Sequence, residues 1–484
     1  MIAETVLGRT SIVASIAPVT SVAVVPPKAL DRASWSWALF QGARDPYVVL
    51  VMIYVFAPYF VRDVIGSPVQ GQLLVAAAAK YAGWIVLLTV PLLGAAVDRM
   101  GPRKPWLAAT LALMVPITAA LWWVTPGGAI GPIGALAIFA AMNVMIAWSD
   151  TLHNALLLPA AGMARAGAAS GAALALVNFT SVVMLAVIFG AFALPGKVAW
   201  SFIPAHPLFG LDPLTHETDR IVGPLCAALM LVGSLPLFAF VPDVASTGTR
   251  IGAAIRGGAA DLVALFREAR GHGNALVYLA SVLLFTDGLT GILVFTGIYA
   301  GGAMGWGSLE LLAYGMILSC FSVVGGILGG WLDQTIGPKA ALKIELVGVI
   351  VSQVLGLGQG KDRMFFQPFD QHAHALVWNG PLFRTQPDIA LLVCGFLGAV
   401  SVTAAYASRR TMLTRVVPPN RVGVFFGLFA IAGNATMWLG PLLVEITTGA
   451  TRSQRLGLLP ISGLVLIGLI VLMFVKGGER LAPR

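Results

Sequence analysis

Hydrophobic residues form twelve long runs along the chain, separated by short stretches that hold charges, prolines or polar clusters. Each run contains about 20 mostly apolar residues, enough for a helix rising 1.5 Å per residue to cross roughly 30 Å of hydrocarbon. We therefore predict an all-α membrane protein with twelve transmembrane helices. The predicted helices cover residues 35–60, 72–97, 105–124, 133–152, 168–194, 220–241, 274–300, 308–332, 340–358, 388–408, 421–446 and 456–475.

The composition also indicates a membrane protein. Of 484 residues, 58% are hydrophobic and 11% are charged, and the mean hydropathy is +0.88. Soluble domains carry about 25% charged residues, so the composition excludes a disordered chain, a nucleic-acid-binding module and a cytosolic enzyme. The three cysteines all fall inside apolar runs, which indicates small buried hydrophobes and no disulfide framework.

The net charge of +9 is explained in part by topology. Most of the 30 Lys and Arg residues fall on one side of the predicted membrane, and cytoplasmic loops retain such residues. Both termini are therefore expected in the cytoplasm, with tails at 1–34 and 476–484. An alternative, a signal peptide around residues 11–25, is disfavoured by Pro18 and by the absence of a small-residue cleavage pattern. The excess charge requires no nucleic-acid partner.

Three segments outside the runs stand out. Residues 242–273 are expected to join the two six-helix halves, 35–241 and 274–475, either as an amphipathic helix on the inner membrane surface or as a simple tether. Two long outer loops, 195–219 and 359–387, are rich in Pro and aromatic residues. The second holds Asp370, His372 and His374, which we interpret as an exposed polar turn; we expect no metal and no cofactor.

An internal repeat relates the halves. The end of predicted helix 2 and the loop after it hold Gly94, Asp98, Arg99, Gly101, Pro102, Arg103 and Lys104. The end of predicted helix 8 and its loop hold Gly329, Asp333, Gly337, Pro338 and Lys339 in the same order. Two parallel six-helix halves, related by an axis along the membrane normal, account for this repeat.

The first of these loops resembles the signature of the major facilitator superfamily, G-x-x-x-D-R-x-G-R-R, with Pro102 at the place of the first arginine of the final pair. Other passages are similar to the branch of fungal vacuolar amino-acid effluxers and their bacterial relatives. They are Ser36 to Phe40, Phe56 to Phe60, His153 to Leu157, Phe295 to Ala300, Phe425 to Leu428 and Trp438 to Pro441. The resemblance implies a twelve-helix secondary transporter with a small-molecule substrate. We expect it in a bacterial inner membrane, with protons as the second partner because no nucleotide-binding loop is present.

Charged residues inside the runs are the strongest functional signal. Each costs about 2.5 to 3.5 kcal/mol at the centre of a span, so it must face a cavity or another charge. Counting 1.5 Å per residue places seven polar side chains roughly 14–18 Å from the cytoplasmic boundary. They are Arg44, Asp45, Lys80, Asp287, Asn143, Asn178 and Asn434. We expect them to share one pocket at the midplane, and we expect Pro46 to kink the first helix and expose backbone near Gln41 and Gly42.

We assign roles to these residues from their chemistry. Arg44 and Asp45 point about 100° apart on a helix, which predicts different partners for each. Lys80 is expected to pair with Asp45 or Asp287, leaving Arg44 to bind a substrate anion. Asp45 and Asp287 are the candidate proton carriers. Burial raises the pKa of a carboxylate towards neutrality, and a cationic neighbour lowers it again. The candidate substrate-binding residues are Arg44, Lys80, Gln41, Asn143, Asn178 and Asn434.

The two repeated loops are candidates for an inner latch, a role that the resemblance implies. Asp98 is expected to bond across to the other half, at an exposed helix N-terminus. The latch residues are Gly94, Asp98, Arg99, Gly101, Arg103, Lys104, Asp333 and Lys339. The alternative is that the basic members only anchor the loops on the cytoplasmic side.

The sequence thus predicts proton-coupled export of a small zwitterionic or anionic metabolite by alternating access, with amino acids favoured by the resemblance alone. A monomer in the lipid bilayer is expected. An amphiphile, lipid or drug exporter and a non-transporting membrane scaffold are the alternatives. No phosphate-binding loop, metalloprotease motif or nucleophile elbow is present in the sequence, so neither ATP as the driver nor an enzyme is expected.

Overall fold

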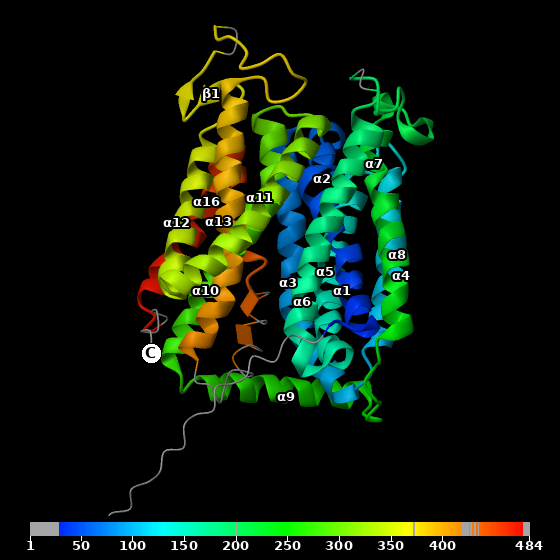
Figure 1. Ribbon diagram of the computed structural model, residues 1–484, viewed down its shortest axis with the longest axis vertical. Helices are drawn as coiled ribbons and strands as arrows, with labels where there is room; N and C mark the ends of the chain where they lie inside the picture. Colours follow the sequence, from blue (N-terminus) through cyan, green and yellow to red (C-terminus); the bar gives the residue numbers. More distant parts are fainter. Residues whose placement is uncertain are drawn as a thin grey trace, which may run out of the picture.

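The computed structural model describes residues 29–198, 201–370, 373–417 and 435–477, together with residues 425, 428, 429, 432 and 433. Long helices form two bundles that stand side by side, and helix α9 (Ile251–Ala269) runs across one end of both (Figure 1). We call this the α9 end and the opposite one the far end. Within the described residues, eleven helices are long and apolar enough to cross a membrane.

These eleven spans agree with eleven of the twelve predicted helices. The twelfth span, predicted at 421–446, lies partly outside the described residues, and α15 forms the part that the structure describes. The N-terminal half contains α1 (Arg32–Arg44), η1 (Val48–Tyr54), α2 (Phe56–Tyr59), η2 (Phe60–Val64), α3 (Pro68–Met100), α4 (Lys104–Ala119), η3 (Ala120–Trp123), α5 (Pro132–Ala155), α6 (Leu157–Ile188), η4 (Phe189–Ala193), α7 (Glu217–Arg220) and α8 (Val222–Phe240). The C-terminal half contains α10 (Gly273–Ala303), α11 (Ser308–Thr335), α12 (Pro338–Leu357), α13 (Gln386–Val416), α15 (Leu439–Thr451) and α16 (Gln454–Met473).

The first span is broken as the sequence predicts. Helix α1 ends at Arg44, directly before Asp45-Pro46, because proline has no N–H to donate to the carbonyl of Gly42. The chain continues as the wide π-helical turns of η1 and breaks again at Val55, where φ is −120° and ψ is −70°. π-helical turns are rare and often mark functional sites.

The two halves are packed together at the far end. A Cβ on Gly297 of α10 would lie 1.7 Å from the carbonyl oxygen of Ile53, and one on Gly315 of α11 would lie 2.7 Å from the ring of Tyr54. Only glycine permits such close approach of one half to the other. The rings of Tyr54 and Tyr314 meet edge to face there, with their centroids 6.2 Å apart.

Polar contacts reinforce this closure. Asp63 binds Arg62, whose Nη1 donates to the carbonyl oxygen of Trp306 in the other half at 3.3 Å. Ser308, also in the C-terminal half, donates its hydroxyl to Asp219. We call Arg62, Asp63, His216, Asp219, Trp306 and Ser308 the far-end closure.

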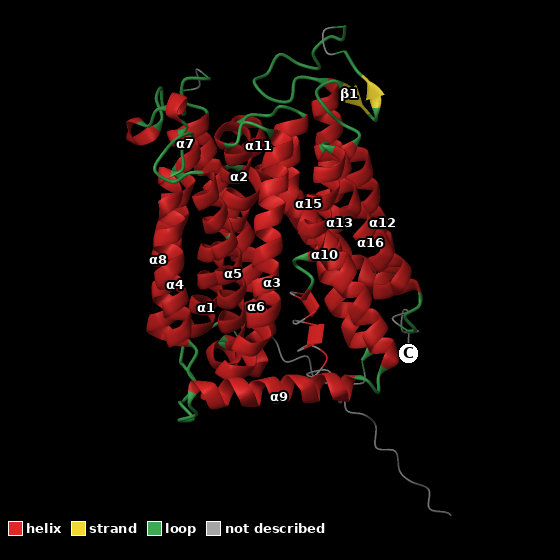
Figure 2. Cartoon of the chain, turned by 180° about the vertical axis from the view of Figure 1, so that it is seen from behind, coloured by secondary structure: helices red, strands yellow, loops and turns green. Residues whose placement is uncertain are grey.

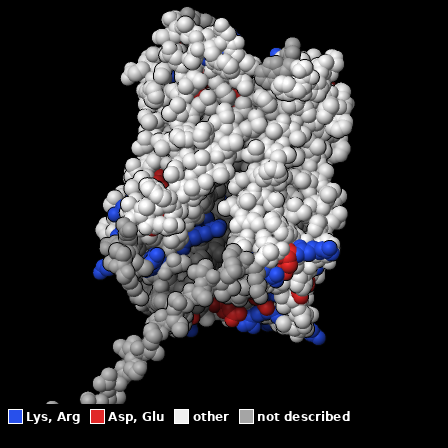
Figure 3. Space-filling model, viewed as in Figure 1, with Lys and Arg blue, Asp and Glu red and all other residues white. Residues whose placement is uncertain are grey.

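Towards the α9 end the halves are apart. Figure 3 shows a hollow between them, and Lys or Arg side chains reach its edge from the C-terminal half. Figure 2, from behind, shows α9 crossing beneath both bundles. The structure is therefore closed at the far end and open towards α9.

Helix α9 occupies the segment expected to be an amphipathic linker. It packs mainly against α3: Gly258 lies against Ala95 and Ala96, and Arg99 forms a two-bond ion pair with Asp261 at 2.7 and 2.8 Å. Its apolar side chains Ile251 and Val263 are more than half exposed. That exposure suits a helix lying on a membrane surface.

Candidate functional site

Arg44 is the centre of a charged cluster in the N-terminal half. Its Nε donates to Asp45 at 2.8 Å, its Nη1 to Ser149 at 3.0 Å, and its Nη2 to both Asp45 and Asp150. Gln41 donates to the other oxygen of Asp45 at 3.1 Å. Helix α1 supplies Arg44 and α5 supplies Ser149 and Asp150, so the cluster joins two helices.

The expectation that Arg44 and Asp45 would need different partners is wrong. It considered only the directions in which the two side chains leave the helix, and the long, flexible arginine side chain reaches round to its neighbour. Arg44 is only 1% exposed and its donors are occupied, whereas the side chain of Asp150 is 44% exposed. One guanidinium therefore serves two carboxylates, and the ionised cluster carries one excess negative charge.

Aromatic side chains hold α1 against α5 beside this cluster. The Trp37 indole N–H donates to the carbonyl oxygen of His153, and His153 Nε2 contacts the carbonyl oxygen of Trp37, both at 2.8 Å. Their rings stack with centroids 4.2 Å apart. This interlocked pair fixes the spacing at which Arg44 meets Ser149 and Asp150.

Lys80 forms a separate ion pair at the seam between the halves. Its Nζ lies 2.6 Å from Glu445 Oε2 on α15, and the rings of Tyr81 and Trp84 flank it at 4.3 and 5.5 Å. The expected pairing of Lys80 with Asp45 or Asp287 is therefore wrong. Glu445 lies inside the predicted span 421–446, so the sequence contained a signal for this partner.

Asp287 has a backbone partner. The N–H of Gly440, in the first turn of α15, donates to Asp287 Oδ2 at 2.6 Å, and Asp287 is 4% exposed. The first amides of a helix have no partner within the helix, and its dipole favours a carboxylate there. Asp287 thus joins α10 to α15. Of the seven polar groups expected in one pocket, the six that the structure describes are instead divided among separate sites.

The amides contribute less than expected. Asn143 and Asn178 each donate to a carbonyl oxygen one turn earlier in their own helix, Phe139 at 2.9 Å and Leu174 at 3.0 Å. Asn434 lies outside the described residues.

Arg409 on α13 is a group that the sequence reasoning missed. Its Nη1 donates to the Thr286 hydroxyl at 2.8 Å, beside Asp287 in the chain, and its guanidinium lies 4.3 Å from the ring centre of Tyr406 and 5.4 Å from that of Phe429. Its Nε is buried without a hydrogen-bond partner. Among the described residues no carboxylate pairs with it, and residues 418–434 of the sequence contain no Asp or Glu.

A buried carboxylate on α12 was also missed. Glu345 is 3% exposed and accepts from the Ser408 hydroxyl at 2.9 Å, while its second oxygen is buried without a partner. It lies inside the predicted run 340–358, so the signal was present in the sequence.

The predicted latch residues bond locally. Asp98 accepts from Arg103 of its own loop at 2.8 Å, not from the other half as expected, because the halves are apart at this end. Lys104 Nζ donates to the carbonyl oxygen of Phe238 at 2.9 Å, and the N–H groups of Arg103 and Lys104 bind Asp243. In the second loop, Lys339 donates to the carbonyl oxygen of Val475 and Asp333 Oδ1 is buried without a partner.

Gly94 and Gly101 fit tight places in the first loop. A Cβ on Gly101, whose φ is +99°, would lie 2.0 Å from the carbonyl oxygen of Ala245, and one on Gly94 would lie 3.3 Å from Thr151. The loop is thereby fastened to the chain that leads into α9.

The polar cluster of the second long loop is described only in part. His372 lies outside the described residues, and His374 Nδ1 contacts the carbonyl oxygen of Asp370 at 2.9 Å. Within the described residues there is no group of three or more His, Cys, Asp or Glu side chains that could hold a metal ion.

Comparison with known sequences identifies relatives of part of the chain. Residues 383–479 match the family described as Vacuole effluxer Atg22 like. Autophagy-related protein 22 of Yarrowia lipolytica is 26% identical over 228 residues, which are 45% of this chain and 35% of that protein. The uncharacterized MFS-type transporter YxiO of Bacillus subtilis is 22% identical over 209 residues, 43% of this chain and 42% of that protein. The chain thus matches well under half the length of these relatives.

Comparison with solved structures covers nearly the whole chain. A D-xylose-proton symporter superposes with a TM-score of 0.60 at 13% identity, covering 93% of this chain and 99% of that one. At this identity the likeness concerns the fold. The chain is a multi-pass membrane protein with the fold of the major facilitator superfamily, and it resembles the Atg22-like effluxers and their bacterial relatives.

Proposed function

We propose that this protein is a secondary active transporter that exports a small zwitterionic metabolite, such as an amino acid, in exchange for protons. Its two halves would alternate around the hollow of Figure 3, with the α9 end in the cytoplasm of a bacterial cell. We infer a monomer, because each half completes the hollow with the other half of the same chain. The proposal depends on one observation: the N-terminal half holds an excess carboxylate beside Arg44, and the C-terminal half holds a guanidinium, Arg409, that no described carboxylate pairs with.

The N-terminal half supplies the negative partner. Arg44 is enclosed, and each of its three nitrogens already bonds Asp45, Ser149 or Asp150, so its charge is matched within the half and is not offered to a substrate anion. The carboxylate of Asp150 is nearly half exposed and shares its cation with Asp45. It is therefore suited to accept a substrate ammonium group.

The C-terminal half supplies the positive partner. Arg409 is bonded to a neutral hydroxyl and two aromatic rings, so its charge is not neutralised by the described residues. A guanidinium binds a carboxylate through two parallel N–H bonds. An amino acid with its carboxylate at Arg409 and its ammonium at Asp150 would connect the halves, and the Arg44 role expected from the sequence passes to Arg409.

Proton exchange is assigned to carboxylates that have too few cations. Asp45 and Asp150 share one guanidinium, so one of them can take up a proton and leave the cluster neutral. Asp287 is buried with only a backbone donor. A substrate ammonium arriving at Asp150 would compete with that proton, which is the requirement for antiport.

Reconstituted vesicles test the substrate assignment. We expect uptake of radiolabelled leucine to be inhibited by unlabelled leucine but far less by 3-methylbutylamine or 4-methylpentanoate, which each lack one of its charges. Arg409→Gln should weaken the binding of leucine about 10- to 100-fold, because a charge-assisted hydrogen bond contributes about 1.5–3 kcal/mol to binding. Arg410→Gln, the exposed neighbour of the same charge, is the matched control. Equal inhibition by all three compounds would refute a zwitterion site.

The same vesicles test coupling. An imposed pH gradient should drive leucine flux in the wild type, and Asp45→Asn or Asp287→Asn should uncouple flux from the gradient. If both variants keep the pH dependence of the wild type, the assignment of the proton to these carboxylates is wrong, while the substrate assignment stands.

A further inference from the structure

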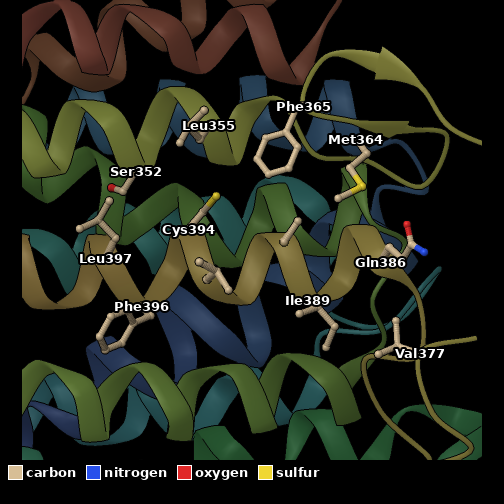
Figure 4. Close-up of a pocket in the computed structure, with 12 residues that line it drawn as sticks. Ser352, Leu355, Met364, Phe365, Val377, Gln386, Ile389, Cys394, Phe396 and Leu397 are labelled. Carbon is tan, nitrogen blue, oxygen red and sulfur yellow. The ribbon is translucent and has the colours of Figure 1, made fainter.

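A second cavity lies on the outside of the C-terminal half, near its far end. It has a volume of about 650 Å³, within the range of about 300–1,000 Å³ typical of ligand pockets. Helices α12 and α13 form its floor, and the loop that joins them supplies Met364, Phe365 and Val377 (Figure 4). The cavity thus extends from a membrane-spanning helix pair to the loop above it.

This cavity is separate from the proposed substrate path. At 100° per residue, its lining residue Val393 and Arg409 lie about 160° apart around α13. Val393 is 62% exposed, and Ile389 and Phe396 are more than a third exposed. Apolar side chains exposed at this place on a spanning helix contact lipid. The cavity therefore opens to the bilayer.

The lining has almost no hydrogen-bonding capacity to offer. The hydroxyl of Ser352 is occupied by the carbonyl oxygen of Val349 at 2.9 Å, and Cys394 is a free, buried thiol. Gln386 is exposed at the start of α13, at the rim. A polar metabolite would lose its water here without compensation, whereas a hydrocarbon chain would not.

The loop is shaped at a conformational cost. Strands β1 (Arg363–Met364) and β2 (Gln367–Pro368) are joined by Phe365-Phe366, which have φ of +48° and +69°. Two-residue turns with positive φ at both positions favour Asn and Gly. The two phenylalanines have different contacts: Phe366 packs against Gly358, and Phe365 lines the cavity.

The surface of the loop suits a membrane interface. Leu376, Val377 and Trp378 are 43–52% exposed, and tryptophan is enriched where hydrocarbon meets water. Two exposed arginines lie next to lining residues. Arg363 directly precedes Met364, and the carbonyl oxygen of Arg384 accepts from the N–H of Val377 at 2.9 Å. Asp362 is 3.7 Å from Arg363, and Arg384 has no carboxylate partner among the described residues.

We propose that this cavity is a binding site for a phospholipid of the outer leaflet. One acyl chain occupies the groove over Ile389, Val393 and Phe396, and the anionic phosphate lies by Arg363 and Arg384. The apolar lining matches an acyl chain, and the exposed arginines of the loop that supplies Met364, Phe365 and Val377 match the phosphate.

Thiol labelling tests occupancy of the groove. In detergent-solubilised Val393→Cys protein, dioleoyl phosphatidylglycerol should slow the reaction of the new thiol with N-ethylmaleimide several-fold. The native, exposed Cys320 on α11 does not line the cavity and is the internal control. Equal slowing at both thiols, or at neither, would overturn the proposal.

Thermal unfolding tests the same site without a reactive probe. Phosphatidylglycerol should raise the Tm of the wild type. It should not raise the Tm of Val393→Trp, in which the indole fills the groove. The control Val347→Trp, at an exposed position on α12 that does not line the cavity, should show the same rise as the wild type. Arg363→Gln with Arg384→Gln should reduce the gain, whereas Arg452→Gln should not. If Val393→Trp keeps the full rise in Tm, only annular lipid is bound and the proposal is wrong. If uncharged dioleoylglycerol raises the Tm equally, the phosphate does not contribute to binding.

Discussion

The two halves of the molecule treat their membrane-embedded arginines in opposite ways. Arg44 is enclosed by two carboxylates and a hydroxyl, whereas Arg409 has a hydroxyl, two aromatic rings and a free Nε. A buried cation with its full set of partners is a structural element, because removing it leaves charges uncompensated. A cation without a counter-ion is available to a ligand. The comparison teaches that a charge's partners, more than its depth in the membrane, indicate its role.

Replacing each arginine by methionine should separate these roles and gives the largest expected effect. Arg44→Met should lower the free energy of unfolding by about 3–5 kcal/mol, because Asp45 and Asp150 lose their shared cation. Arg409→Met should change it little, since no described carboxylate depends on Arg409. Denaturation in detergent micelles measures both.

A combined variant sharpens that comparison. Arg44→Met with Asp45→Asn and Asp150→Asn should recover most of the lost stability, because no charge is then left unpaired. Equal destabilisation by Arg44→Met and Arg409→Met would contradict the distinction between the halves.

The seam between the halves gives a smaller effect. Lys80→Met leaves Glu445 without its partner at 2.6 Å and should cost about 1.5–3 kcal/mol, less than Arg44→Met because Glu445 is 24% exposed. The exchange Lys80→Glu with Glu445→Lys should restore part of the loss, whereas Lys80→Glu alone should be worse than Lys80→Met. The thermal unfolding midpoints of the four proteins decide the matter.

The far-end closure gives the smallest effect and depends on pH. His216 lies 3.6 Å from Asp219 and 3.7 Å from Asp63, and these carboxylates raise the pKa of His216 above its usual 6.5, with Asp219 contributing most. A raised pKa means that the folded state favours the protonated imidazole. This stabilisation is complete below about pH 6.5 and is lost as the pH rises through the higher folded-state value.

His216→Gln should therefore reduce the decline in Tm between weakly acidic and alkaline pH. His374→Gln, which alters an exposed histidine of the other long loop, should retain it. If the pH profile of Tm is unchanged in His216→Gln, the imidazole does not stabilise the far-end closure.

The fold was predictable because membrane spans are specified by long apolar runs, which the sequence states directly. The break before Pro46 was predictable for the same reason, since the missing N–H is a property of one residue. Partner choice was not, because it depends on which helix faces which. The pairing of Lys80 with Glu445 depends on the packing of α3 against α15, which the sequence does not specify.

Arg409 was missed for a specific reason. It stands one residue beyond the predicted run 388–408, where Lys and Arg indicate the cytoplasmic side, yet α13 continues to Val416. The excess of basic residues at that boundary therefore concealed a buried arginine that no described carboxylate pairs with. Asp150, Glu345 and Glu445 lay inside predicted runs, and testing every acidic residue there would have found them.

The attachment of α9 has a mechanical consequence. Its 19 residues form a rod of roughly 28 Å that is clamped to α3 by Arg99–Asp261 and by the close approach of Gly258, so it would travel with the N-terminal half as a lever arm. The covalent pivot between the halves then shortens to Arg270, Gly271 and His272, just before α10 begins. If the halves rock as proposed, residue insertions at this three-residue joint would alter the swing, whereas insertions before α9 would leave it intact.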